Sequence, residues 1–381
     1  MPLQAPEQET DQTPVSLKLI DCDIHPSFPK GLFTLAPYLS MEWRRKLGVM
    51  EQRPSWAASL SNSGFSIPKN DVYNILSGGI RMDAIPEDAV PASTPQMVAE
   101  QHLDPLGIDR GILLTSGVFG LGAVPNAHTA AAIASATNDW LDNEWLQVDE
   151  RFRASIIVAP QDPVAAAAEV RRMADRPGVV QIFMPSDYRL MGDPHFYPLY
   201  EAAAESNLPI AVHPTGIEGM YTNGPKLGGV PSYHIEWHTL LTMPSQANVV
   251  SMVAHGVFER FPNLRVVLTE SGIGWLLELM WRMDKNWKGL RDEVPWLKRR
   301  PSEYMLEHFR FTTQPLLEPD RREHLHSLLE MVQAEKVLMF STDFPHWDGD
   351  DPQTVLNLLP AHMRERVAAQ TAIELYGERL A

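Results

Sequence analysis

Cysteine, long apolar runs and an excess of basic residues are all missing from this sequence. Cys22 is the single cysteine among 381 residues, so no disulfide can form within the chain, as is usual in a reducing cytoplasm. No apolar stretch approaches the roughly 20 residues that a helix needs to span a bilayer. The 32 Lys and Arg are outnumbered by 48 Asp and Glu, and the net charge of −16 argues against nucleic acid or an anionic membrane as partner. We expect a cytoplasmic globular protein that acts on a small-molecule substrate.

Several common catalytic motifs are missing as well. The sequence has no Gly-x-Ser-x-Gly turn and no His-Glu-x-x-His helix, and the glycines of residues 117–122 do not fit a dinucleotide- or phosphate-binding loop. Residues 1–16 are polar and acidic and lack the basic and apolar parts of a signal peptide, so we expect a disordered lead-in. The chemistry is therefore to be sought in residues 17–381.

Short apolar runs recur along the rest of the chain. Eight of them are rich in Val, Ile, Leu and Phe: Leu17–Ile20, Gly111–Thr115, Ala154–Val158, Val179–Phe183, Pro209–Val212, Arg265–Thr269, Phe309–Thr313 and Val337–Ser341. Most are continuous rather than alternating, which is typical of strands buried on both faces. Helical patterns lie between them, as in residues 163–174, 195–206 and 274–286. This alternation predicts a parallel α/β fold, and eight strands favour a (β/α)8 barrel over an open doubly wound sheet.

We expect residues 17–381 to form one barrel domain with two long excursions. Residues 26–104, rich in Pro, Ser and Trp, are too many for an ordinary loop between a strand and a helix, and predict an inserted lid or subdomain. Residues 215–233 contain five glycines and predict a mobile loop over the active site.

Polar side chains follow the predicted strands at the end where barrel enzymes carry their catalytic groups. These are Asp23 and His25 after the first strand, His213 after the fifth, Glu270 after the sixth and Asp343 after the eighth. Because side chains alternate along a strand, Asp21, Asp23 and His25 are expected to share the face that points into the barrel.

Two carboxylates and two imidazoles at one barrel mouth predict a divalent metal site. Zn²⁺ is our first choice, with Mn²⁺ or Fe²⁺ as alternatives, because these ions accept both nitrogen and carboxylate ligands. Without a cation, the crowded acids would repel one another and take up protons. Each residue taken singly also fits a hydrogen-bonded position at a strand end, so the prediction depends on the set.

Four segments carry a resemblance to a known family. Residues 21–26 (Asp-Cys-Asp-Ile-His-Pro), His213, the stretch from Gly256 to Gly272, and residues 341–346 (Ser-Thr-Asp-Phe-Pro-His) resemble the amidohydrolase-related proteins. The similar branch includes aminocarboxymuconate semialdehyde decarboxylase and the dihydroxybenzoate decarboxylases. The resemblance covers nearly the whole chain after residue 16. It implies a distorted (β/α)8 barrel and a small, often aromatic, carboxylic substrate that is hydrolysed or decarboxylated without oxidation.

The resemblance also assigns the ligands. It implies that Asp23, His25, His213 and Asp343 hold the metal. Many members of the family carry His-x-His or Glu-x-His at the first strand, where this chain has Asp23. The sixth strand often ends in a histidine that transfers a proton, whereas Glu270 stands here and could act as a fifth ligand, a metal bridge or a general base.

Three functions are compatible with this site. The first is a metal-dependent hydrolase of an amide, a lactone or a vinylogous C–C bond, in which Asp343 moves the proton of a metal-activated water. The missing strand-six histidine favours it. The alternative is a non-oxidative decarboxylase of a hydroxybenzoate-like or muconate-like acid, with protonated Asp343 as proton donor. The second alternative is a binding barrel without catalytic activity, which the buried acids disfavour.

The remaining candidates would surround the substrate. They are Arg81, His234, His238, His255, His346 and Trp347. Arg81 could clamp a substrate carboxylate, although a surface ion pair is the commoner role of such a residue. His234 and His238 share one face of a predicted helix. We also expect a homodimer or a higher homo-oligomer.

Overall fold

The computed structural model describes residues 18–50, 79–214 and 233–381. The predicted disordered lead-in, residues 1–16, lies outside the described residues. So do residues 51–78 of the predicted insertion and nearly all of the glycine-rich segment 215–233.

Eight parallel strands form one sheet, in the order β1-β3-β4-β5-β6-β7-β8-β9. Their bounds are β1 Ile20–Ile24, β3 Arg110–Leu113, β4 Phe152–Ile157, β5 Val179–Phe183, β6 Ile210–Val212, β7 Val266–Leu268, β8 Phe309–Thr312 and β9 Leu338–Met339. The eight predicted runs therefore supply the eight strands, and the expectation of a (β/α)8 barrel is confirmed. The first strand begins three residues later than predicted. The last begins one residue later, because residues 334–337 form a helical turn, and it ends two residues earlier, at Met339.

Backbone hydrogen bonds join the two outer strands and almost close the barrel. Cys22 N donates to Phe340 O at 3.0 Å, Asp343 N donates to Asp23 O at 3.1 Å, and His25 N donates to Phe344 O at 2.8 Å. The chain on either side of this seam carries candidate metal ligands, so closure of the barrel brings the first and last of them together.

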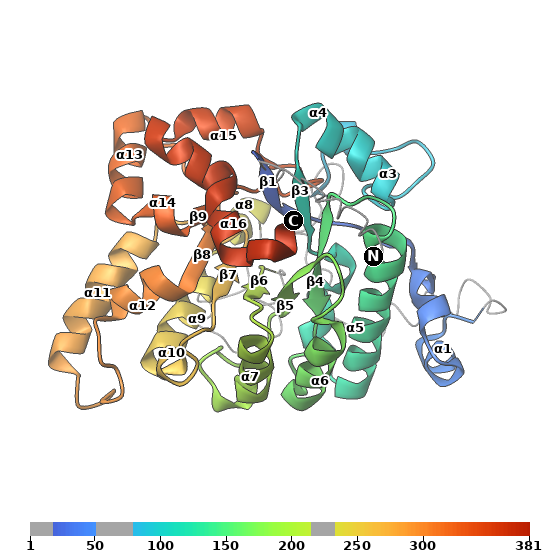
Figure 1. Cartoon of the computed structure of the whole chain (residues 1–381), viewed down its shortest axis with the longest axis horizontal. Helices are drawn as coiled ribbons and strands as arrows, with labels where there is room; N and C mark the ends of the chain where they lie inside the picture. The colour runs from blue at the N-terminus through green and yellow to red at the C-terminus, as the bar shows by residue number, and fades with distance from the viewer. Residues whose placement is uncertain (1–17, 51–78, 215–232) are drawn as a thin grey trace, which may run out of the picture.

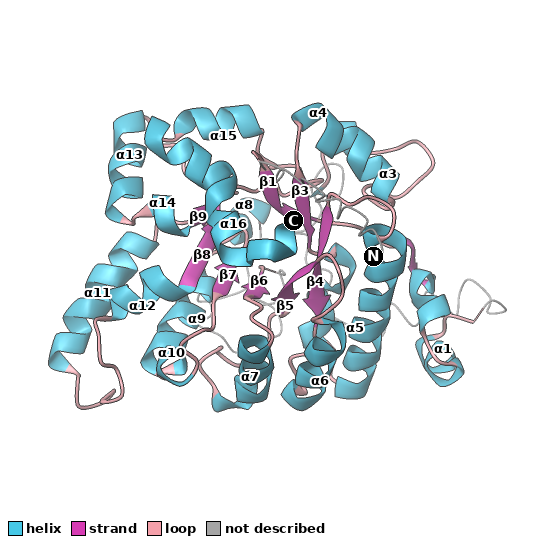
Figure 2. Ribbon diagram, viewed as in Figure 1, coloured by secondary structure: helices cyan, strands magenta, loops and turns pink. Residues whose placement is uncertain are grey.

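Helices surround the strands on all sides (Figure 2). In the first half of the chain they are α1 Met41–Leu47, α3 Pro95–Val98, α4 Asp104–Leu106, α5 Ala127–Leu141, α6 Pro163–Met173 and α7 Tyr197–Glu205. In the second half they are α8 His234–Thr239, α9 Met243–Ala254, α10 Val257–Arg260, α11 Leu276–Gly289, α12 Pro301–His308, α13 Arg322–Met331, α14 Ala334–Val337, α15 Pro352–Leu358 and α16 Thr371–Tyr376. Among the described residues, no helix combines the length and apolar character that a membrane crossing requires.

Local sequence explains where several helices begin. Asn126 caps α5 by accepting a hydrogen bond from Thr129 N at 2.9 Å, and Asp162 caps α6 by accepting from Ala165 N at 3.0 Å. Pro163 follows Asp162 at the first helical position, where its missing N–H costs nothing. The predicted helix over residues 163–174 is accordingly found as α6.

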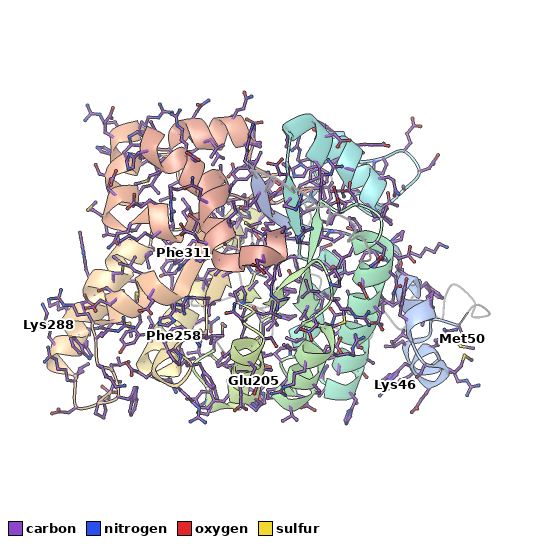
Figure 3. All side chains as sticks on the ribbon, in the orientation of Figure 1. Lys46, Met50, Glu205, Phe258, Lys288 and Phe311 are labelled. Atoms are coloured by element: carbon purple, nitrogen blue, oxygen red, sulfur yellow. The ribbon has the colours of Figure 1, made fainter. Side chains whose placement is uncertain are left out.

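The C-terminal segment packs against the amino ends of the strands (Figure 1). Tyr376 of α16 donates a hydrogen bond to Gln181 Oε1 of β5 at 2.7 Å. Arg153, at the start of β4, donates to Leu380 O at 2.8 Å. In Figure 3, Phe311 of β8 lies among the strands, whereas Lys288 and Lys46 lie at opposite outer edges. Because the C-terminal segment covers the amino ends of the strands, the carboxyl ends form the end of the barrel that can hold a site.

The described part of residues 26–104 contains β2 (Pro29–Leu32), α1, α3 and several short helical turns. Ile80, at its second described stretch, forms an antiparallel bridge with His346, and Arg81 N donates to Pro345 O at 2.9 Å. This segment thus reaches the loop that follows β9. That it acts as a lid stays a prediction.

Candidate metal centre

Four of the predicted residues come together at the carboxyl ends of the strands. Asp23 belongs to β1, His25 follows it, His213 follows β6 and Asp343 follows β9. All four are buried, and one potential ligand atom from each lies within 4.8 Å of the others. His25 Nε2 lies 2.7 Å from Asp343 Oδ1 and 3.2 Å from Asp23 Oδ1, while His213 Nε2 lies 3.6 Å from Asp23 Oδ2.

Backbone carbonyls fix the tautomers of both imidazoles. His25 Nδ1 is 2.8 Å from Leu114 O, and His213 Nδ1 is 2.6 Å from Pro214 O. A carbonyl oxygen can only accept, so Nδ1 carries the proton in each ring. In both histidines Nε2 therefore faces the cluster and is the nitrogen that a cation could bind in place of a proton, which is the arrangement that metal-binding histidines adopt.

Several polar atoms of the cluster are buried without a hydrogen bond. These are both carboxylate oxygens of Asp23, Oδ2 of Asp343 and Nε2 of His213. Burying such atoms unpaired costs about 1–3 kcal/mol each, and more where the group is charged. Two carboxylates and two imidazole nitrogens are suitable ligands for a divalent transition metal, so the donor set fits a divalent metal ion.

Mutual attraction within the cluster sets its ionisation. Burial opposes the charge on Asp23, but His25 and His213 outweigh it and lower the pKa of that carboxyl. Burial also opposes ionisation of Asp343, yet His346 and His25 lower its pKa. For His25, burial favours the neutral ring, whereas Asp23 and Asp343 raise its pKa well above the usual value. Both aspartates are thus held as carboxylates, the form that binds a cation.

Two residues at strand ends adopt left-handed backbone conformations. The φ angle is 47° at Glu270 and 64° at Asp343. Such angles are unfavourable for residues other than glycine and occur most often at functional sites. Glu270 N donates to Thr312 Oγ1 at 3.1 Å, which fixes the turn after β7. Glu270 Oε2 then lies 3.1 Å from His213 Nε2, beside the cluster.

A pocket of about 330 Å³ opens over the cluster. Its lining combines aromatic rings with a few polar groups: Gly79, Ile80, Ser116, Phe119, His213, Pro214, His234, Trp237, His238, Glu270, His346, Trp347 and Asp348. Phe119 stacks on His213 with ring centroids 4.5 Å apart, and Trp347 packs against His238 at 5.5 Å. Aromatic walls around a metal centre suit a flat, unsaturated ligand.

Asp21 does not share the position of Asp23 and His25 that the alternation predicted. Its Oδ2 lies 2.8 Å from His102 Nε2, and its Oδ1 accepts a hydrogen bond from Thr342 N at 3.0 Å. The register between β1 and β3 shifts between Asp21 and Ile24, which breaks the simple alternation of side chains. Asp21 therefore anchors the residue before Asp343 instead of joining the cluster.

Comparison with known proteins identifies the family. A family model described as Amidohydrolase matches residues 20–377, which is most of the chain. The chain belongs to this amidohydrolase family. The resemblance noted in the sequence is thus confirmed, including its decarboxylase branch.

Individual relatives of this amidohydrolase include proteins of known activity. The gamma-resorcylate decarboxylase of Rhodococcus jostii (strain RHA1) is 29% identical over 254 residues, which cover 61% of this chain and 72% of the relative. The crystal structure of 5-carboxyvanillate decarboxylase from Sphingomonas paucimobilis has a TM-score of 0.62 at 21% identity and covers 95% of this chain and 99% of that one. A dihydroxybenzoic acid decarboxylase from Polaromonas sp. JS666, with bound manganese and the inhibitor 2-nitroresorcinol, has a TM-score of 0.61 at 19% identity over 95% of this chain and 97% of that one.

These likenesses overturn our first functional expectation. We expected a hydrolase, with a decarboxylase as the alternative, because Glu270 replaces a strand-six histidine. The relatives just described are decarboxylases, so the expectation of a hydrolase is wrong and the alternative is favoured. The replacement of one proton-transferring histidine by Glu270 was not enough to distinguish hydrolysis from decarboxylation.

The predicted substrate-binding residues of this amidohydrolase divide into two groups. His234, His238, His346 and Trp347 line the pocket. Arg81 instead forms a two-point ion pair with Asp83, with Nε–Oδ1 at 3.0 Å and Nη2–Oδ2 at 2.6 Å. His255 is exposed at the end of α9. Neither Arg81 nor His255 belongs to the pocket lining.

Sequence reasoning missed several contributors to the site, of which three matter most for its chemistry. Asp348 lies in the pocket wall, Phe119 stacks on His213, and His102 pairs with Asp21 behind the cluster. None of them follows a strand directly, so the strand-end rule could not find them. Asp348 stands five residues beyond Asp343 in an acidic stretch (Asp348-Gly349-Asp350-Asp351), and that stretch was the one signal available.

Proposed function

We propose that this protein is a metal-dependent, non-oxidative decarboxylase of a small aromatic carboxylic acid. The observation that carries the proposal is the buried cluster of Asp23, His25, His213 and Asp343 beside an aromatic-lined pocket of about 330 Å³ whose lining includes His213. Such a pocket suits a planar ring, and a cation held by the cluster would bind the carboxylate of that ring. The activities of the relatives support the same reaction.

We infer that Asp23, His25, His213 and Asp343 hold the metal. A divalent cation there would supply the positive charge that binds the substrate carboxylate and stabilises the electron-rich ring. We favour manganese over zinc, because half of the donor set is carboxylate and the Polaromonas structure contains manganese.

The reaction needs one proton at carbon. The bond between the ring and the carboxylate breaks, CO₂ leaves, and the electron pair that remains on the ring carbon takes up a proton. We assign this proton to Glu270, which lines the pocket beside the cluster. Burial, with Asp343, Asp348 and Asp23 nearby, raises the pKa of Glu270 well above its usual value, which favours the protonated form that a proton donor needs. Water at the pocket mouth then restores the proton.

Asp343 is less suited to this step than our initial interpretation held. Its Oδ1 lies 2.7 Å from His25 Nε2 and 2.6 Å from His346 Nδ1. These two imidazoles lower the pKa of Asp343, so it stays ionised. We therefore assign Asp343 to metal binding and Glu270 to proton transfer. The cytoplasmic location and the homo-oligomer stay predictions.

A substrate panel tests the proposal. The full chain is loaded with Mn²⁺ and incubated with hydroxybenzoates, aminobenzoates and methoxybenzoates, and CO₂ release is measured beside ester and amide cleavage. We expect CO₂ from at least one ring acid, loss of activity with chelator, and recovery with Mn²⁺. Hydrolysis without CO₂ would contradict the proposal. A protein that binds no metal and turns over nothing would support the inactive binding barrel.

A further inference from the structure

The pocket is acidic beyond the four candidate metal ligands. Glu270 and Asp348 both line it, whereas the lining residues in the described part of the chain include neither lysine nor arginine. Arg81, which was predicted to bind a substrate carboxylate, forms an ion pair with Asp83 instead. A substrate in this pocket would therefore meet the positive charge of a cation held by the four candidate ligands and the negative charge of Asp348.

Neighbouring side chains hold Asp348 in place. Its Oδ2 lies 3.0 Å from His238 Nε2 and accepts a hydrogen bond from Gln314 Nε2, also at 3.0 Å. Gln314 is fully buried. His238 packs against Trp347 at 5.5 Å and His234 at 5.4 Å. Because its partners are themselves packed, the Asp348 carboxylate is a fixed acceptor in the pocket wall rather than a mobile surface group.

We propose that Asp348 determines substrate specificity. It selects aromatic acids that carry a single carboxylate together with a hydroxyl or amino group facing this wall, and it rejects acids with a second carboxylate there. This inference rests on the decarboxylase function proposed above, since it takes the reacting carboxylate to lie at the metal.

Electrostatics gives the direction of the preference. A hydroxyl or amino group donates to Asp348 and forms a charge-assisted hydrogen bond. A methoxy group at the same place has no hydrogen to donate and leaves the partly buried Asp348 carboxylate without a hydrogen bond from the ligand, which lowers affinity. A second carboxylate would meet the Asp348 carboxylate as a like charge in a partly buried site, and repulsion of this kind is a common source of specificity.

A second cation is the main competing account of this wall. Potential ligand atoms of His238, Glu270 and Asp348 lie within 4.8 Å of one another. An ion held there would reverse the charge of the wall, so acids with a second carboxylate would then bind more tightly than phenols. The same binding experiment therefore separates the two accounts.

The test uses ligands that cannot lose CO₂. In a series of 2-nitrophenols, the nitro group replaces the reacting carboxylate, and one further ring position at a time carries a hydroxyl, a methoxy or a carboxylate. Binding to the Mn²⁺-loaded full chain is measured by calorimetry for wild type, Asp348→Asn and Glu318→Gln. Glu318 is an exposed acid outside the pocket lining and serves as the matched control.

We expect the best hydroxyl compound to bind wild type about tenfold more tightly than its methoxy counterpart, and the carboxylate compound to bind most weakly. Asp348→Asn should reduce the hydroxyl preference to about threefold or less and tighten binding of the carboxylate compound about tenfold, while Glu318→Gln leaves the order unchanged. If wild type prefers a carboxylate at any position, or Asp348→Asn keeps the wild-type order, the inference fails.

The two proposals fail in different ways. If carboxylate compounds bind best while the protein still releases CO₂ from an aromatic acid, only the specificity assignment is overturned. If no nitrophenol binds and no CO₂ is released, both the specificity assignment and the proposed function are contradicted. Should Asp348→Asn not fold, the order of the three substituents on wild type decides alone.

Discussion

His25 Nε2 lies 2.7 Å from Asp343 Oδ1, although 318 residues separate the two along the chain. The pair spans the seam between the first and last strands, where Asp343 N also donates to Asp23 O at 3.1 Å. Candidate ligands lie on both sides of this seam, so a bound cation would connect the first strand of the barrel to the last. Metal binding and stability of the fold should therefore be coupled.

Metal removal is expected to destabilise the protein. A ligand present at about 1,000 times its Kd stabilises the folded state by roughly 4 kcal/mol, so chelation should lower Tm by several degrees. Calorimetric scans with and without chelator measure the shift. His213→Ala should show a low Tm that chelator no longer changes, whereas the exposed His255→Ala should behave as wild type. An unchanged wild-type Tm after complete metal removal would contradict the coupling.

Glu270→Gln should reduce kcat by about 10²–10³ and leave metal content unchanged. Glutamine keeps the size of the side chain but cannot supply a proton, and general acid catalysis contributes about 10²–10⁴ to a rate. Steady-state CO₂ release and elemental analysis give the two readouts. The exposed Glu278→Gln on α11 is the control. Normal turnover by Glu270→Gln would exclude proton donation by Glu270, and loss of metal would mark it as a ligand instead.

The fold could be predicted because its strands are buried on both faces. The run Val179–Phe183, for example, is found as β5 with the same bounds and is buried throughout. The meeting of the four candidate ligands could be predicted because strand ends in a barrel converge. Asp21 was placed wrongly because the register shift in β1 depends on pairing with β3, which one strand's sequence does not reveal. Asp348 and Trp237 enter the pocket from segments beyond the strand ends, whose paths depend on tertiary packing.

Asp21→Ala is expected to destabilise the fold by about 3 kcal/mol. The change removes the acceptor of hydrogen bonds from Thr342 N and Thr342 Oγ1 and the partner of His102, all of them buried. Urea unfolding monitored by circular dichroism measures the loss. Asp292→Ala, at an exposed position, should change stability by less than about 0.5 kcal/mol. Equal stability of both variants would show that the buried network contributes nothing.

Asp350 is expected to make stability depend on pH. Burial, with Glu318, Asp348 and Asp343 nearby, raises the pKa of Asp350 to about 7 in the folded protein. In the unfolded chain its pKa is about 4. Between these values the folded state keeps a proton that the unfolded state has lost, so this residue's contribution falls as the pH rises from about 4 to 7.

Asparagine cannot ionise, so the Asp350→Asn variant should not show the decrease in folding stability that Asp350 causes between about pH 4 and 7. At pH 8 the variant should be more stable than wild type by roughly 2 kcal/mol, and at pH 4 the two should be nearly equal. Thermal unfolding across this range tests the prediction, with exposed Asp320→Asn as the control. A variant that is no more stable than wild type at pH 8 would show that Asp350 ionises at an ordinary pH.

The origin of the hydrogen in the product tests the central claim most directly. A substrate that turns over is converted by the Mn²⁺-loaded protein in D₂O, and CO₂ and the ring product are quantified by mass spectrometry. Non-oxidative decarboxylation predicts one CO₂ per product and one deuterium at the carbon that carried the carboxylate. A product that has gained the elements of water without releasing CO₂ would contradict the account.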